Sequence, residues 1–188
     1  MRIKIFDNMA QCTDEEVQRM LPLVSAQRRE QALRYKHTFG RFCCLKSWMM
    51  LQELIGEMPE WQYNEHGKPF IEGGPHFSLS HCKEGIAVAV DDEPIGIDIE
   101  HIRHADEDLI KRTMNDEEIR LIASANANAA FTRLWTQKEA IVKAQGIGIT
   151  SFEQLQTVLE QRTWNVETYE NEKYIYSIAY GKLHCFSA

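Results

Sequence analysis

Ile95-Gly96-Ile97-Asp98-Ile99-Glu100 decides the fold, because apolar residues alternate in this stretch with small or acidic ones. Alternation with a period of two predicts a β-strand. Side chains two residues apart point the same way, so Asp98 and Glu100 share one face, about 6.5–7 Å apart at the backbone. Such a pair suits a magnesium ion, which typically takes one or two carboxylates plus substrate phosphates. The alternative is a solvated outer strand face, where acidic residues simply meet water.

A helix is predicted downstream, from about Ala129 to Gln145. Trp135, Glu139 and Lys143 are spaced four apart and therefore line up on one face of this helix. If that face meets the Asp98 strand, three carboxylates and one ammonium surround a single phosphate. The alternative is an ordinary exposed Glu–Lys pair, which contributes about 0.3–0.5 kcal/mol.

Each half of the chain shows helices followed by strands that look antiparallel. Helix starts are expected at Thr13, Ser25 and Asn115, and Glu118 fits a capping box with Asn115. Strands are expected at 1–7, 61–63, 77–80, 86–90, 95–100 and 174–180. We predict an α+β protein of two related lobes, an N-terminal lobe of residues 1–93 and a C-terminal lobe of residues 94–188.

Basic residues concentrate in one region, where Arg28, Arg29 and Arg34 precede Arg41. Any polyanion that this acidic protein binds must meet such a local basic patch.

Two further segments place polar side chains where they could reach a ligand. In Gly67-Lys68-Pro69 a proline stiffens the turn that carries Lys68. His81 follows Ser80 at the end of the strand predicted over 77–80, a place where side chains often project into a cleft. A solvated lysine and a surface histidine are the alternatives.

Composition argues against some functions and favours one compartment. The 188 residues carry 21 basic against 28 acidic side chains, a formal charge of -7, which opposes a general affinity for nucleic acid or anionic membranes. The cysteines are odd in number, and no two of them form a Cys-x-x-Cys motif. As small residues beside apolar neighbours they suit a reducing cytosol. They are Cys12, Cys43, Cys44, Cys82 and Cys185. No signal peptide or membrane-spanning run is found, so we expect a cytoplasmic protein.

Taken in order, these segments resemble the Sfp-type 4'-phosphopantetheinyl transferases. Gly96-Ile97-Asp98-Ile99-Glu100 matches one family motif, and Leu134-Trp135-Thr136-Gln137-Lys138-Glu139-Ala140-Ile141-Val142-Lys143 matches another. Gly67-Lys68-Pro69, the stretch from Phe77 to His81 and the basic helical region add to the likeness, which runs from about residue 25 to 148. The part after about residue 152 is short compared with larger family members.

The resemblance implies two similar α/β lobes in pseudo-twofold arrangement, with coenzyme A in the cleft between them. It implies an enzyme that transfers the phosphopantetheine arm of coenzyme A to a serine of an apo acyl- or peptidyl-carrier protein. Such an enzyme releases adenosine 3',5'-bisphosphate, and we expect this one to be a monomer.

The resemblance also assigns roles to single residues. Asp98, Glu100 and Glu139 look like ligands of a magnesium ion that bridges the pyrophosphate, and Glu139 is the first choice for the base that activates the carrier serine. The other implied contacts are all with coenzyme A: Arg28 and Arg41 with its 3'-phosphate, Lys143 with its pyrophosphate, and Lys68, Pro69, Ser80 and His81 along the rest of the molecule.

Two rival functions are considered. A metal-dependent exonuclease could also hold magnesium on an Asp-x-Glu strand, but it needs further aspartates in a set pattern, and the negative charge does not suit nucleic acid. A carrier-binding scaffold without catalysis would leave Asp98 and Glu139 dispensable.

Overall fold

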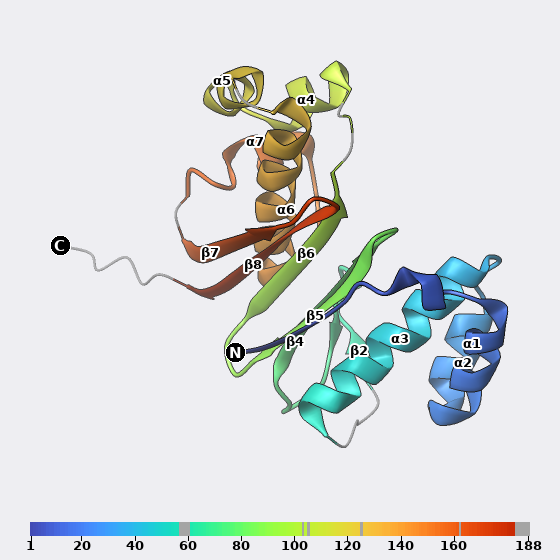
Figure 1. Cartoon of the computed structure of the whole chain (residues 1–188). Helices are drawn as coiled ribbons and strands as arrows, with labels where there is room; N and C mark the ends of the chain where they lie inside the picture. Colours follow the sequence, from blue (N-terminus) through green and yellow to red (C-terminus); the bar gives the residue numbers. More distant parts are fainter. Residues whose placement is uncertain (57–60, 103, 105, 125, 162, 183–188) are drawn as a thin grey trace.

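The computed structural model describes residues 1–56, 61–102, 104, 106–124, 126–161 and 163–182. It is a mixed α/β structure with two three-stranded antiparallel sheets and a two-stranded ribbon. Figure 1 shows one long helix lying along each large sheet. Within the described ranges, no helix combines the length and the apolar character needed to cross a bilayer.

The first half begins with a strand, continues with helices and ends with strands. The two predicted helix caps are present: the hydroxyl of Thr13 accepts from the amide of Glu16, and that of Ser25 from the amide of Arg28. The elements are β1 (Arg2–Phe6), η1 (Met9–Gln11), α1 (Asp14–Met20), η2 (Leu21–Leu23), α2 (Ala26–Leu33), α3 (Thr38–Ile55), β2 (Gln62–Tyr63), β3 (Pro69–Phe70), β4 (His76–Cys82) and β5 (Gly85–Asp91).

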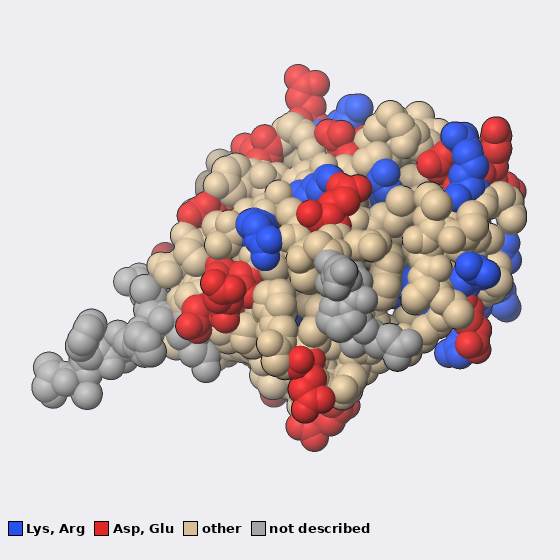
Figure 2. All heavy atoms as spheres, turned by 90° about the horizontal axis from the view of Figure 1, so that it is seen from below, with Lys and Arg blue, Asp and Glu red and all other residues tan. Residues whose placement is uncertain are grey.

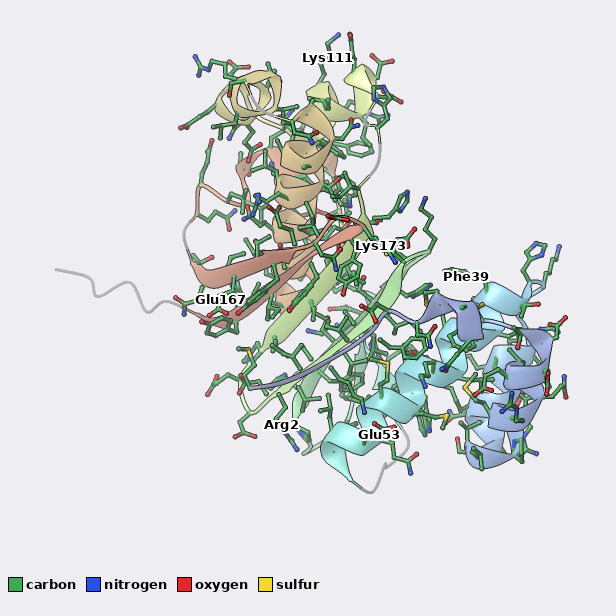
Figure 3. All side chains as sticks on the ribbon, viewed as in Figure 1. Arg2, Phe39, Glu53, Lys111, Glu167 and Lys173 are labelled. Carbon is green, nitrogen blue, oxygen red and sulfur yellow. The ribbon has the colours of Figure 1, made fainter. Side chains whose placement is uncertain are left out.

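The first sheet has the order β1-β5-β4, so the last strand of this half lies in the centre. Ile86, Val88 and Val90 point from β5 into one core with apolar residues of α3, including Phe42 and Leu45. Arg2 and Glu53, labelled in Figure 3, mark where β1 meets the end of α3. There Arg2 donates to the carbonyl of Leu54.

The second half likewise begins with a strand, continues with helices and ends with strands. Its elements are β6 (Ile95–His101), α4 (Glu107–Thr113), α5 (Asp116–Ser124), α6 (Ala127–Gln145), α7 (Phe152–Thr157), β7 (Trp164–Glu170) and β8 (Tyr174–Lys182). The sheet order is β6-β8-β7, so the last strand is again central and pairs with the first strand of its half. In both halves, a strand leads through helices to a long helix and then to a hairpin that closes on that strand.

The two sheets contact each other through small and branched apolar residues. Ala87 and Ala89 of β5 share a buried cluster with Ile97 and Ile99 of β6 and Ile178 of β8. Cys12, Cys43, Cys44 and Cys82 are free thiols, mostly buried as predicted, and Cys185 lies outside the described residues. Figure 2 shows acidic and basic side chains interspersed on one face of the molecule.

Candidate active site

The site lies along the seam where β4 of the first sheet meets β6 of the second. The hydroxyl of Ser78 accepts a hydrogen bond of 3.1 Å from the amide of Ile97. Two residues further along β4 and one further along β6, the hydroxyl of Ser80 donates to Asp98 Oδ1 over 2.8 Å. Serine side chains therefore join the two sheets at the residue that the sequence singles out.

Gly96 explains how α6 reaches this seam. A Cβ atom at position 96 would lie 1.9 Å from the carbonyl oxygen of Ala140 and 2.5 Å from the amide nitrogen of Ala144. Only glycine lets the backbone of α6 lie directly on β6 without displacement. Because of this close approach, the face of α6 that carries Glu139 and Lys143 meets the Asp98 strand.

Lys143 forms a partly buried network with Asp98 of β6 rather than an ordinary surface pair on its own helix. Its ammonium lies 2.6 Å from Asp98 Oδ1 and 3.0 Å from the hydroxyl of Ser80. Asp98 is only 4% exposed, and its second oxygen, Oδ2, is buried without a hydrogen-bond partner among the described residues. An unpaired buried carboxylate oxygen is costly, so a ligand for it is expected.

Glu139 stands close enough to the other two carboxylates to feel their charge. Burial raises its pKa to about 7, the negative charges of Asp98 and Glu100 add to this effect, and the ammonium of Lys143 opposes it. Such crowding of acidic groups around one carboxyl with a raised pKa is typical of functional sites.

The donor set fits a divalent cation that shares its coordination with a phosphorylated ligand. Among the described residues, no three carboxylate, imidazole or thiol groups lie close enough to hold a metal ion by themselves. Magnesium commonly takes only one or two carboxylates and completes its shell with water and phosphate. The unpaired Oδ2 of Asp98 would be available to such an ion.

Two adjoining cavities open beside the network. One, of about 440 Å³, is lined by Lys68, Pro69, Glu139 and Lys143 among others. A second, of about 200 Å³, shares Pro69 and Leu79 with the first and contains the side chains of Arg28 and His81. Predicted residues from both halves therefore line two cavities that share lining residues.

Lys68 lines the first cavity, but its ammonium is engaged with α6. It donates to the carbonyl of Lys143 over 2.6 Å and lies 3.4 Å from the carbonyl oxygens of Ala144 and Ile95. Burial lowers its pKa to about 8. Sequence reasoning did not foresee these contacts with α6, and the expected contact of Lys68 with a ligand stays a prediction.

Arg28 is almost completely enclosed, with 5% of its surface exposed. Its guanidinium lies 3.9 Å from the ring centre of Trp61 and 5.1 Å from that of Trp48, and it donates to Gln31 over 2.8 Å. Burial lowers the pKa of Arg28. Within the described part of the chain its Nε has no hydrogen-bond partner.

The remaining arginines of the basic region have other partners. Arg41 donates from Nε to the carbonyl of Tyr35 over 2.9 Å, which places it beside the second cavity. Arg34 forms an exposed ion pair with Glu30, and Arg29 donates to the carbonyl of Leu21.

His81 sits at the rim of the second cavity and stays accessible to solvent. Its ring centre is 5.8 Å from that of Phe39, which Figure 3 shows at the start of α3. Desolvation by the surrounding protein lowers the pKa of His81, the charge of Lys143 lowers it further, and Asp98 opposes the shift. This setting favours the neutral imidazole.

Sequence reasoning missed the role of Lys138 next to Glu139. Lys138 is fully buried and donates to Glu118 over 2.6 Å, to the carbonyl of Leu155 over 2.6 Å and to that of Thr113 over 2.9 Å. Glu118 also accepts from the amide of Asn115, as the predicted capping box requires. Lys138 lies four residues after Leu134 and therefore on the apolar face of the helix. A lysine in that position indicates a buried ion pair, and this was the signal available in the sequence.

The fold and the site together define a mixed α/β protein whose acidic and lysine side chains meet between two antiparallel sheets. Residues 94–184 match the profile of the 4'-phosphopantetheinyl transferase superfamily.

Curated relatives extend the match into the first half. The 4'-phosphopantetheinyl transferase psf-1 of Bacillus pumilus is 31% identical over 165 residues, covering 79% of this chain and 71% of that protein. The transferase gsp of Aneurinibacillus migulanus is 32% identical over 73% of this chain and 64% of its own length. AcpT of Salmonella typhimurium is 38% identical over 53% of this chain and 58% of its own. The chain belongs to the 4'-phosphopantetheinyl transferase superfamily.

Proposed function

We propose that this protein transfers the 4'-phosphopantetheine arm of coenzyme A to a serine of an apo acyl- or peptidyl-carrier protein. The partly buried network of Asp98, Lys143 and Ser80 beside the carboxylate of Glu139 carries this proposal. Glu139 supplies a base and the ammonium of Lys143 a cation, and both line the first cavity. Relatives that match most of the chain are named for this reaction.

Coenzyme A would lie along the two adjoining cavities. Pro69 and Leu79 line both cavities, so a long ligand would cross from one to the other past these residues. Arg28, with Arg41 nearby, would meet the 3'-phosphate, because guanidinium groups bind phosphate through paired donors. His81 and Ser80 would contact the pyrophosphate of coenzyme A on one side, and Lys143 would contact it on the other.

Transfer needs a base and a stabilised leaving group. The carrier serine would give its proton to Glu139, directly or through water, as its oxygen forms a bond to the phosphorus that bears the pantetheine arm. The bond from that phosphorus to the bridging oxygen of the pyrophosphate breaks, and adenosine 3',5'-bisphosphate leaves with the electron pair. A base with a pKa of about 7 suits this step at neutral pH. Lys143 would stabilise charge on the departing phosphate.

Magnesium is the cation we propose for the site. Asp98, Glu100 and Glu139 are its proposed ligands, and the unpaired Oδ2 of Asp98 supports this assignment. Because no three such groups form a metal site by themselves among the described residues, water and pyrophosphate oxygens would complete the coordination. When bound, the ion would neutralise charge on the pyrophosphate.

Two lobes in pseudo-twofold arrangement would frame the reaction, residues 1–93 with the basic side chains and residues 94–188 with the acidic ones. The equivalent sheet orders β1-β5-β4 and β6-β8-β7 support this division. Each lobe places its long helix, α3 or α6, after its first strand.

The test is to incubate the protein with coenzyme A, magnesium and several apo carrier proteins, and to look by intact mass for the added arm. Transfer that stops when magnesium is chelated supports the proposal. Binding of a carrier without any mass change, in every carrier tried, would favour the scaffold alternative.

A further inference from the structure

The turn that carries Lys68 is built by a single asparagine. Asn64 Oδ1 accepts from the amides of His66 over 3.0 Å and Lys68 over 2.8 Å. The backbone closes the same turn, because the amide of Gly67 donates to the carbonyl of Asn64 over 2.9 Å. Gly67 has a positive φ of 80° there. An Asx-type turn of this kind fixes where Lys68 points.

This turn from the first half contacts the last turn of α6 in the second half. The side-chain amide of Asn64 donates to the carbonyl of Gly146 over 2.8 Å, and Lys68 donates to the carbonyl of Lys143 over 2.6 Å. Gly146 ends the helix with φ 75°. The last four carbonyls of a helix lack partners within it, and a cation there also meets the negative end of the helix dipole.

Lys143 is therefore held at both ends. Its carbonyl accepts from Lys68, while its ammonium donates to Asp98 and Ser80. A loose last turn would let the backbone of Lys143 shift against β6, and a shift of about 1 Å at a reacting group can cost about a hundredfold in rate.

We propose that Asn64 and Lys68 form a latch on the last turn of α6 and act as positioning residues for Lys143. The inference rests on the proposed transfer reaction. It also assigns Lys68 a main role other than contact with coenzyme A.

Variants separate these roles. Asn64→Asp keeps the oxygen that builds the turn but replaces the donor to Gly146 with a repelling oxygen. Lys68→Met keeps the length of the side chain without its ammonium, and Lys68→Arg restores a cationic donor. The matched controls are Asn8→Asp and Lys173→Met, the same chemical changes at exposed positions; Figure 3 shows Lys173 in the turn before β8.

Three measurements are made on each variant: turnover, coenzyme A affinity by calorimetry, and amide hydrogen exchange in the peptide covering residues 140–147. The latch predicts that Asn64→Asp and Lys68→Met each lower turnover by about 10- to 100-fold and speed exchange by about tenfold. Coenzyme A affinity should change by less than about threefold, Lys68→Arg should recover most of the turnover, and the double variant should lose less than the sum of the two effects.

Two outcomes would overturn the latch. One is a loss of coenzyme A affinity above about tenfold in Lys68→Met while Asn64→Asp behaves like its control, which would make Lys68 a ligand contact. The other is unchanged exchange in both variants. Exchange needs no carrier protein, so a wild-type protein that transfers nothing would refute the proposed function while the latch is still judged by exchange.

Discussion

Replacing Glu139 with Gln should stabilise the protein above neutral pH while it abolishes most of the activity. Burial and the charges of Asp98 and Glu100 raise the pKa of Glu139 from 4.5 to about 7, so the folded state prefers the protonated carboxyl. Its ionisation costs the fold nothing below about pH 4.5. As the pH rises from there through about 7, the unfolded chain loses this proton more readily, and stability falls.

The pKa values fix the size of the effect. A difference of one unit corresponds to about 1.4 kcal/mol, so the shift from 4.5 to about 7 gives an upper value of about 3 kcal/mol. The side chain keeps partial contact with water, which screens the charges, so about 1–3 kcal/mol is expected at pH 8. Glutamine imitates the neutral form and avoids this penalty.

Urea unfolding at pH 5 and pH 8, without divalent cations, measures the difference between Glu139→Gln and the wild type. The difference should be small at pH 5 and reach about 1–3 kcal/mol at pH 8. The exposed change Glu153→Gln on α7 serves as the control. Adding magnesium should narrow the difference, because a bound cation relieves repulsion among the carboxylates. An identical difference at both pH values would refute the reasoning about the carboxylate cluster.

The same variant tests the base in single-turnover experiments. Loss of a general base predicts turnover lower by about a hundredfold or more, with little change in coenzyme A binding. If Glu139 acts mainly as a metal ligand, raising the magnesium concentration should restore much of the activity. Near-normal rates at every magnesium concentration would eliminate both roles.

Three further substitutions test the architecture of the site. Gly96→Ala places a methyl group 1.9 Å from a backbone carbonyl of α6, so we expect a loss of about 1–3 kcal/mol in urea unfolding and turnover lower by about a hundredfold; wild-type stability would contradict the close packing. Lys138→Met leaves the buried carboxylate of Glu118 without its ion-pair partner, which should cost about 3–5 kcal/mol by the same measurement. Adding Glu118→Gln should recover part of that loss, and no recovery would argue against the ion pair. Arg41→Ala should weaken coenzyme A binding more than 3'-dephospho-coenzyme A binding in calorimetry, and equal losses would remove Arg41 from the 3'-phosphate site.

Periodic patterns predicted most of the fold. Alternation located β6 and β8, and polar caps located the starts of α1, α2 and α5, because these signals depend on neighbours in sequence. The sequence pattern does not predict strand β7, because Trp164–Glu170 mixes polar and apolar residues without clean alternation. Its partial exposure at a sheet edge explains the weak pattern.

The site was predictable where its residues share one element and hidden where they do not. Spacing placed Asp98 with Glu100 and Glu139 with Lys143. It could not reveal that Lys68 would turn toward the end of α6, because the two positions are 75 residues apart. For the same reason nothing in the sequence indicated that aromatic rings of α3 and the following loop would enclose Arg28.

The central position of the last strand in each sheet has a consequence for synthesis on the ribosome. β1 pairs with β5, so the first sheet can close once about residue 91 has emerged. Among the described strands, β6 pairs with β8, whose residues begin at Tyr174, so its pairing comes much later. Until then, the isoleucine side chains of β6 stay exposed, and the unpaired strand can associate with other chains. The first sheet is already complete at that stage. It can bind the new strand β6 through the contact between Ser78 and Ile97 before β8 is made.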